Sequence, residues 1–243
     1  MNNISIIIPC LNYEKLIFNN LEKIVDKINV FNLKYEIIVI NDGSSDNTSN
    51  EVLRFMKNNE NIKLISNKIN KGKSLSIISA IKECKFNTII LIDCDIPYFN
   101  YFEKVINNIN DDYDLVIVNR RLKESKMIDN NLNLYQITRA KIGNLIGFII
   151  NLFLKINVEG TDTQAGLKAF KKVKEFDNFN FYSKKYFFDL ELIYHYTKNN
   201  KKILSVPVIY EPPNFSNIKI FSFKNFIILY EFIKIVFILK LFK

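Results

Sequence analysis

The sequence predicts an α/β protein built around a doubly wound, mostly parallel sheet flanked by helices. Its first hundred residues contain short, unbroken runs of Ile, Val and Leu, which are typical of strands buried on both faces. Segments with apolar residues at helical spacing separate these runs. Strands that alternate with helices in this way favour parallel pairing, with the helices covering the two faces of the sheet.

The expected elements of the first half follow in order. We expect strands over 4–8, 36–40, 61–66 and 88–92, with helices over 14–31, 46–58 and 73–84 between them. Polar turns close three of the strands, at 9–12, 41–44 and 93–95. Because ligands of such sheets lie beyond the carboxyl ends of the strands, these turns are predicted to meet at one functional edge.

The second half is less regular. We expect a strand over 114–118, a mobile loop over 122–133, a helix over 134–156, a glycine-containing turn and short strand within 161–170, a helix over 186–197 and a strand over 203–208. A helical tail follows over 221–243. Neither an internal repeat nor a low-complexity linker is visible, so we predict one catalytic domain over 1–220 and a tail over 221–243.

Positive charge is concentrated in the second half of the chain. The 243 residues carry a formal net charge of +9. Residues 1–110 hold 13 Lys/Arg against 12 Asp/Glu, whereas residues 111–243 hold 21 against 13. An anionic partner, either a lipid or a phosphorylated substrate, is therefore expected at the second half, with a solvated lysine-rich surface as the alternative. Nucleic acid is not expected, because the basic residues lack an aromatic-interleaved or helix-turn-helix context.

The cysteines and the N-terminus favour a cytoplasmic protein. Cys10, Cys84 and Cys94 form neither a C-x-x-C pair nor a metal-ligand pattern, so we expect reduced, buried thiols. The chain runs from Met1 directly into its first strand, without the charged segment of a signal peptide. The sequence also lacks a P-loop, a zinc motif and G-x-S-x-G.

Two carboxylates one residue apart, Asp93 and Asp95, follow the buried run at 88–92. An all-oxygen pair at the end of a strand suits Mg²⁺ or Mn²⁺, although solvated carboxylates at a strand end are the simpler alternative. Lys71 and Lys73 lie at the start of a helix, where backbone N–H groups and positive charge favour phosphate. A solvated basic turn is the alternative there.

Together these motifs resemble the family 2 glycosyltransferases with a GT-A fold. The N-terminal matches are Ile-Ile-Pro9-Cys-Leu-Asn12, Val-Ile-Asn41-Asp42-Gly43-Ser44-Ser45-Asp46, Asn70-Lys71-Gly72-Lys73 and Asp93-Cys-Asp95. The later matches are Val118-Asn119-Arg120-Arg121, the block Asp162-Thr163-Gln164-Ala165-Gly166-Leu167-Lys168, and Phe188-Asp189-Leu190-Glu191. These look like the polyprenyl-phosphate branch, and most closely like the dolichyl-phosphate glucosyltransferase type. The resemblance implies inverting transfer of a sugar from a UDP- or GDP-sugar to a polyprenyl phosphate.

The resemblance also implies roles for individual residues. Donor binding falls to Pro9, Asn12, Asp42, Gly43, Lys73, Asp93, Asp162, Gln164 and Lys168. Metal binding falls to Asp93 and Asp95, and catalysis to Asp95, Arg120, Arg139 and Asp189. In the family the Asp42 position contacts the nucleoside, and Gly43 allows close approach of the backbone. A simple Asp-Gly turn is the alternative for that pair.

The resemblance places the acceptor phosphate at Arg120 and Arg139, with Arg121 as an alternative to Arg120. A phosphate acceptor is ionised near neutral pH and needs no strong base. Transfer to a glycan hydroxyl in surface polysaccharide synthesis is the competing enzymatic hypothesis. It would require a carboxylate base, Asp189 first and Glu191 second, while the single histidine, His195, is expected to be structural.

Two departures from the family pattern matter. Many relatives have a metal-binding Gln where this chain has Pro97, so a water or a phosphate oxygen would have to complete the metal shell. That change keeps open a third hypothesis, a nucleotide-sugar-binding module without catalysis. The Gly-Ser-Lys element of relatives is altered here to residues 214–219, which leaves Ser216 or Lys219 for its phosphate role.

The tail predicts contact with a membrane surface. Residues 226–242 are mostly apolar but include Glu231, Lys234 and Lys240, whereas a spanning helix needs about 20 apolar residues. We therefore predict an amphipathic helix on the cytoplasmic face of a membrane, with 142–156 as a second contact. Two buried core helices are the alternative. A membrane-protein partner or a homo-oligomer is also expected, because many relatives continue into transmembrane helices.

Overall fold

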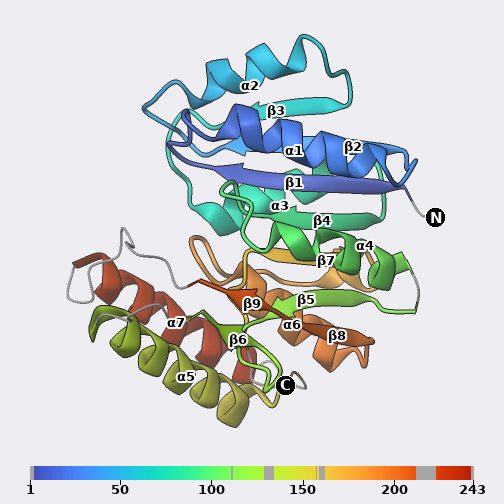
Figure 1. Cartoon of the computed structure of the whole chain (residues 1–243). Helices are drawn as coiled ribbons and strands as arrows, with labels where there is room; N and C mark the ends of the chain where they lie inside the picture. The colour runs from blue at the N-terminus through green and yellow to red at the C-terminus, as the bar shows by residue number, and fades with distance from the viewer. Residues whose placement is uncertain are drawn as a thin grey trace.

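The computed structural model describes residues 3–110, 112–128, 134–156, 158, 162–211 and 223–241. A seven-stranded sheet with the order β3-β2-β1-β4-β7-β5-β8 forms its centre, and helices cover both faces (Figure 1). All pairings in this sheet are parallel except those of β7. The predicted fold class, a mostly parallel α/β sheet flanked by helices, is confirmed.

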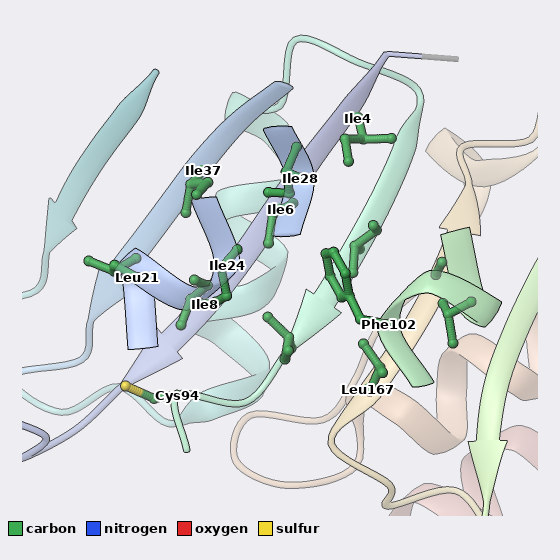
Figure 2. Packing of buried hydrophobic residues seen from close by; sticks show 14 of the residues in the cluster. Ile4, Ile6, Ile8, Leu21, Ile24, Ile28, Ile37, Cys94, Phe102 and Leu167 are labelled. Atoms are coloured by element: carbon green, nitrogen blue, oxygen red, sulfur yellow. The ribbon is translucent and has the colours of Figure 1, made fainter. Parts of the chain in front are cut away.

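The first half of the chain matches the predicted order of strands and helices. It comprises β1 (Ile4–Cys10), α1 (Ile17–Asn29), β2 (Tyr35–Asn41), α2 (Thr48–Met56), β3 (Ile62–Ser66), α3 (Lys73–Glu83) and β4 (Thr88–Ile92). The strands lack polar alternation because apolar layers cover both faces of the sheet. Along β1, Ile6 and Ile8 pack on one face and Ile7 on the other. Figure 2 shows Ile6 and Ile8 beside Leu21 and Ile24 of α1.

The second half adds an antiparallel strand to the centre of the sheet. Its elements are η1 (Phe99–Tyr101), α4 (Phe102–Asn110), β5 (Leu115–Asn119), β7 (Leu167–Lys171), η3 (Phe176–Asn178), α6 (Phe188–Lys198) and β8 (Ile203–Pro207). β7 pairs antiparallel with both β4 and β5. It therefore begins at the edge where β4 ends, which brings the turn before β7 beside Asp93. There the Asp93 N–H donates to the carbonyl of Gly166 at 2.9 Å.

Two features of the second half differ from expectation. Helix α4 was not predicted, although Phe102, Val105, Ile106 and Ile109 recur at helical spacing and are all buried. The segment expected as a loop over 122–133 contains β6 (Lys126–Met127), which pairs in parallel with β9 (Ile209–Tyr210). Residues 129–133 of that loop lie outside the described residues.

The helices α5 (Leu134–Leu154) and α7 (Phe223–Leu241) pack side by side (Figure 1). One side of α7 faces the core through Phe232, Ile235, Val236 and Leu239. The other side is also apolar and exposed, with Leu229, Ile233, Phe237 and Leu241. Lys234 and Lys240 of α7 are exposed as well, so the predicted C-terminal helix is present, and its role at a membrane surface stays a prediction. In α5, residues Gln136–Leu154 are long and apolar enough to cross a membrane, judged by length and composition.

Candidate functional site

The polar turns that follow β1 and β2 are joined at the carboxyl edge of the sheet. The backbone N–H of Asn12 donates to Ser44 Oγ at 2.9 Å, and Asn12 Oδ1 accepts from the N–H of Ser45 at 2.9 Å. Asn12 has a left-handed backbone with φ of 62°, which Asn tolerates better than most residues. Pro9 lies just before this turn, within β1. The predicted meeting of the turns at 9–12 and 41–44 is thus present.

Asp42 organises the segment that leads into α3. Its buried carboxylate accepts hydrogen bonds from Asn67 Nδ2 and from the N–H groups of Lys71 and Gly72, each at 2.9 Å. A carboxylate has about four lone-pair positions, so these bonds leave little capacity for a ligand. At Gly43, where φ is 76°, a Cβ would lie 2.6 Å from backbone atoms of residues 69 and 70. The contact of Asp42 with a nucleoside stays a prediction.

Four backbone N–H groups at the start of α3 already have hydrogen-bond partners. Besides the two N–H groups that Asp42 binds, the N–H groups of Ser74 and Leu75 donate to the carbonyls of Lys185 and Lys184 at 3.1 and 3.2 Å. These four donors have partners within the protein, and the phosphate site expected at Lys71 and Lys73 stays a prediction. The ammonium groups of the two lysines remain as the cationic part of that expectation.

Lys73 lies among carboxylates. Its Nζ donates to Asp93 Oδ1 at 2.5 Å. Burial alone would lower the pKa of Lys73, but the negative charges of Asp93, Asp189 and Asp95 outweigh it and raise the pKa. Partial desolvation raises the pKa of the Asp95 carboxyl, and the negative charge of Asp93 raises it further. The electrostatic field at this edge therefore favours cations.

Asp93 and Asp95 fit a hard divalent cation. Asp95 is exposed to solvent and Asp93 is partly exposed, so both carboxylates are accessible. Within the described residues, no third His, Cys, Asp or Glu joins them in a metal-binding group. Mg²⁺ and Mn²⁺ accept such a shell, because they retain waters and bind substrate phosphates alongside one or two carboxylates. The ammonium group of Lys73, which bonds Asp93, shows that this position stabilises a positive charge.

The turn that carries these carboxylates is fixed from two sides. Asn20 of α1, which is buried, donates from Nδ2 to the carbonyl of Cys94 at 2.9 Å. On the other side, a Cβ at Gly166 would lie 2.7 Å from Asp93 Oδ2 and 2.6 Å from Pro97 Cγ. Between them, Ile96 adopts a left-handed φ of 43°, which is strained for a β-branched residue and typical of functional turns. Sequence reasoning missed Asn20, because nothing distinguishes it from other polar residues of α1.

Arg120 is held by Asp162 through a two-pronged ion pair. Arg120 Nε and Nη2 donate to the two oxygens of Asp162, each at 2.7 Å, and the Arg120 backbone N–H adds a third bond at 3.0 Å. Burial alone would raise the pKa of Asp162, but Arg120 lowers it to about 2. The carboxylate of Asp162 therefore serves to orient Arg120, and Gln164 donates a backbone N–H to it at 3.3 Å.

The other two predicted arginines lie at α5. Arg121 is near Gly143, where a Cβ would lie 2.9 Å from Arg121 Nη2, so the glycine makes room for the guanidinium. Arg139 is located on α5, and its side chain is outside the part of the chain that is described. The predicted cluster of arginines around an acceptor phosphate thus stays a prediction.

The two residues predicted as candidate bases, Asp189 and Glu191, are buried and have polar partners within the protein. Asp189 forms an ion pair with Lys168 at 2.7 Å, and both side chains are less than 5% exposed. Lys168 also donates to the carbonyl of Ala165 at 2.7 Å. Glu191 is fully buried and accepts from the N–H groups of Tyr182 and Ser183 at 2.7 and 3.0 Å.

His195 stacks on Phe179, with ring centroids 4.5 Å apart, and burial lowers its pKa. This packing agrees with the structural role expected for His195.

Replacing Gly166 by Ala should disturb the candidate metal site at Asp93 and Asp95. The added methyl group would press on Asp93 and Pro97, so we expect the rise in melting temperature caused by Mn²⁺ with UDP or GDP to be lost. Differential scanning fluorimetry measures this. The matched control, Gly143→Ala, presses on Arg121 instead and should retain the Mn²⁺ response. An unchanged response in Gly166→Ala would contradict the described packing.

Glu191 should make stability depend on pH. Burial raises its pKa from 4.5 to about 7, partly offset by the two N–H donors. The folded state therefore holds the proton more tightly than the unfolded state, and the stabilisation is lost as pH rises through 7. Relative to Glu191→Gln, we expect the free energy of unfolding of the wild type to fall by up to about 3 kcal/mol between pH 4.5 and 8. Urea denaturation at several pH values tests this, and parallel pH profiles would refute it.

Comparison with known proteins agrees with this arrangement. The model of the family described as Glycosyl transferase family 2 matches residues 5–173. A dolichyl-phosphate beta-glucosyltransferase of Trichomonas vaginalis is 26% identical over 231 residues, covering 89% of this chain and 68% of the relative. The dolichyl-phosphate beta-glucosyltransferase of Dictyostelium discoideum is 27% identical over 220 residues, covering 84% of this chain and 65% of the relative.

Among solved structures, glucosyl-3-phosphoglycerate synthase from Mycobacterium tuberculosis, in complex with Mn²⁺, UDP and phosphoglyceric acid, superposes with a TM-score of 0.62. The match covers 90% of this chain and 72% of that protein, at 15% identity, and so shows the shared GT-A fold. Because the family match spans well over half of the sequence and includes the turns at the carboxyl edge of the sheet, the chain belongs to glycosyl transferase family 2.

Proposed function

We propose that this family 2 glycosyltransferase moves a sugar from a nucleotide diphosphate to a polyprenyl phosphate, with inversion at the anomeric carbon and dependence on Mg²⁺ or Mn²⁺. The observation that carries the proposal is that the segment 162–166 contacts two predicted site residues, Arg120 and Asp93. At one end Asp162 orients Arg120, and at the other Gly166 contacts Asp93. One short segment therefore contacts both the guanidinium proposed for phosphate and the carboxylate turn proposed for metal.

The donor side would work through charge. Asp93 and Asp95 would hold the metal ion, and Lys73 adds positive charge next to Asp93. When bound, the ion neutralises charge on the departing diphosphate. The likeness to the two dolichyl-phosphate beta-glucosyltransferases supports transfer of a sugar to a lipid-phosphate acceptor.

The acceptor side would work through orientation. Arg120 uses Nε and Nη2 to bind Asp162, and a guanidinium has further N–H donors for a phosphate. A phosphate oxygen is ionised at neutral pH, so it attacks the anomeric carbon without a general base. Asp189, the base that transfer to a hydroxyl would need, is buried and paired with Lys168. This pairing favours the phosphate acceptor over the glycan hydroxyl.

Replacing Asp95 by Asn should abolish transfer. Loss of one of two metal carboxylates should lower activity by at least about 100-fold, because metal-assisted departure of the nucleotide supplies several kcal/mol. The assay follows transfer from UDP-glucose and GDP-mannose, in parallel, to a short polyprenyl phosphate. Asp26→Asn, an exposed carboxylate on α1, is the control and should be normal. Normal transfer by Asp95→Asn would overturn the proposal, and so would transfer only to glycan hydroxyls.

The polyprenyl acceptor also implies docking at a membrane surface. Leu145, Phe148 and Leu152 of α5 are exposed and apolar, like Ile233 and Phe237 of the neighbouring α7. Exposed lysines lie on the same two helices, at positions 141, 234 and 240. Apolar side chains accompanied by lysines suit an interfacial helix on an anionic bilayer. We therefore place the protein at the cytoplasmic face of a membrane.

Replacing both Phe148 and Phe237 by Glu should weaken membrane binding. Loss of two exposed aromatic groups and addition of two negative charges should reduce binding to vesicles containing anionic phospholipid by about tenfold or more. Vesicle co-sedimentation measures it. Leu53→Glu, at an exposed apolar position of α2, is the matched control. If both variants bind like the wild type, α5 and α7 are not the docking surface.

A further inference from the structure

Helix α7 contains one acidic residue, Glu231, and it bonds to a neighbouring loop. Glu231 Oε1 accepts from Ser183 Oγ at 3.0 Å and from the N–H groups of Lys184 and Lys185 at 2.8 and 2.9 Å. The other charged residues of α7 are Lys224, Lys234 and Lys240, and most of the remaining ones are apolar. A partly buried carboxylate that accepts three hydrogen bonds stabilises a particular loop conformation, because each donor would otherwise lose its partner.

The same loop caps the first turn of α3. The carbonyls of Lys184 and Lys185 accept from the N–H groups of Leu75 and Ser74, and Ser74 Oγ lies 2.9 Å from Ser183 Oγ. Residues 184 and 185 therefore donate to Glu231 through their N–H groups and accept from α3 through their carbonyls. The first N–H groups of a helix have no partner within it, so this loop supplies what α3 lacks.

The capped turn is the one that presents Lys73 to the metal site. At Gly72 a Cβ would lie 2.4 Å from the carbonyl oxygen of Lys184, so the loop packs directly against the residue before Lys73. Lys73 then reaches Asp93 at 2.5 Å. An unbroken series of contacts thus runs from Glu231 on α7 to the carboxylate pair.

We propose that Glu231 is a positioning residue, which holds loop 183–185 against the start of α3 and thereby keeps Lys73 on Asp93. This inference rests on the proposed function, in which Asp93 binds the metal and α7 faces the membrane. It adds that the seating of α7 influences the metal site, although Glu231 touches neither metal nor substrate. Neither the family resemblance nor the sequence pattern assigned a role to Glu231 beyond a charge that interrupts an apolar run.

Amide hydrogen exchange of Glu231→Ala and Glu231→Gln tests the structural half. In Glu231→Ala we expect the amides of Ser74 and Leu75 to exchange at least about tenfold faster, with strand β4 unchanged, because the opening is local. Glu231→Gln should stay close to the wild type, since its Oε1 still accepts the same bonds. Lys234→Ala, an exposed position of the same helix, is the control. Unchanged amides at 74 and 75, or faster exchange throughout the sheet, would overturn the proposal.

The effect of Glu231 on the metal site is tested by the Mn²⁺ dependence of sugar transfer. In Glu231→Ala the Mn²⁺ concentration for half-maximal transfer should fall at least about fivefold, because Lys73 no longer competes with the ion for Asp93, while the KM for polyprenyl phosphate stays unchanged. Glu231→Gln should restore the wild-type requirement, and an unaltered Mn²⁺ requirement in Glu231→Ala would refute the coupling. If the wild type transfers no sugar, the proposed function fails. The Mn²⁺ titration is then followed by protection of the amides at 93–95, where an unshifted midpoint in Glu231→Ala refutes the inference.

Discussion

The insertion of β7 between β4 and β5 is the constraint on which the site depends. Because β7 runs antiparallel to both neighbours, its first residues enter at the edge where the parallel strands end. The bond between the Asp93 N–H and the Gly166 carbonyl ties the two halves of that edge together. If β7 ran in the other direction, the segment before it, with Asp162 and Gly166, would lie at the opposite edge of the sheet. Arg120 would then lack the carboxylate of Asp162 that orients it.

The charged residues of the site form matched pairs. Lys73 bonds Asp93, Arg120 bonds Asp162, and Lys168 bonds Asp189. A buried charge is costly unless it is paired, so each pair allows a charge to stand at the edge of an apolar core. Asp95 differs, because it has no ion-pair partner among the residues that the structure describes. It is therefore the carboxylate with the most capacity left for an added cation.

Much of this architecture was readable from local pattern, and the rest depends on contacts distant in sequence. Buried strands and the turns between them follow from runs of Ile and Val and from Asp-Gly chemistry, so both were predicted. Helix α4 had a visible apolar spacing that was overlooked. The direction of β7 and the partner of Arg120 were not predictable, because a pattern in one segment does not reveal which distant segment lies beside it. The ion pair of Asp162 with Arg120 is such a contact, and the expected place of Asp162 beside the donor sugar stays a prediction.

Glu231 shows why such distant contacts change the meaning of a residue. In the sequence it interrupts an apolar helix and argues against a membrane span. In the fold it faces inward to a loop 46 to 48 residues away, while Ile233 and Phe237 remain exposed on the other side. One helix thus presents an apolar surface outward and an anchoring carboxylate inward. A surface suited to a bilayer and the start of α3 are joined through a single side chain, so movement of α7 would be transmitted to Lys73.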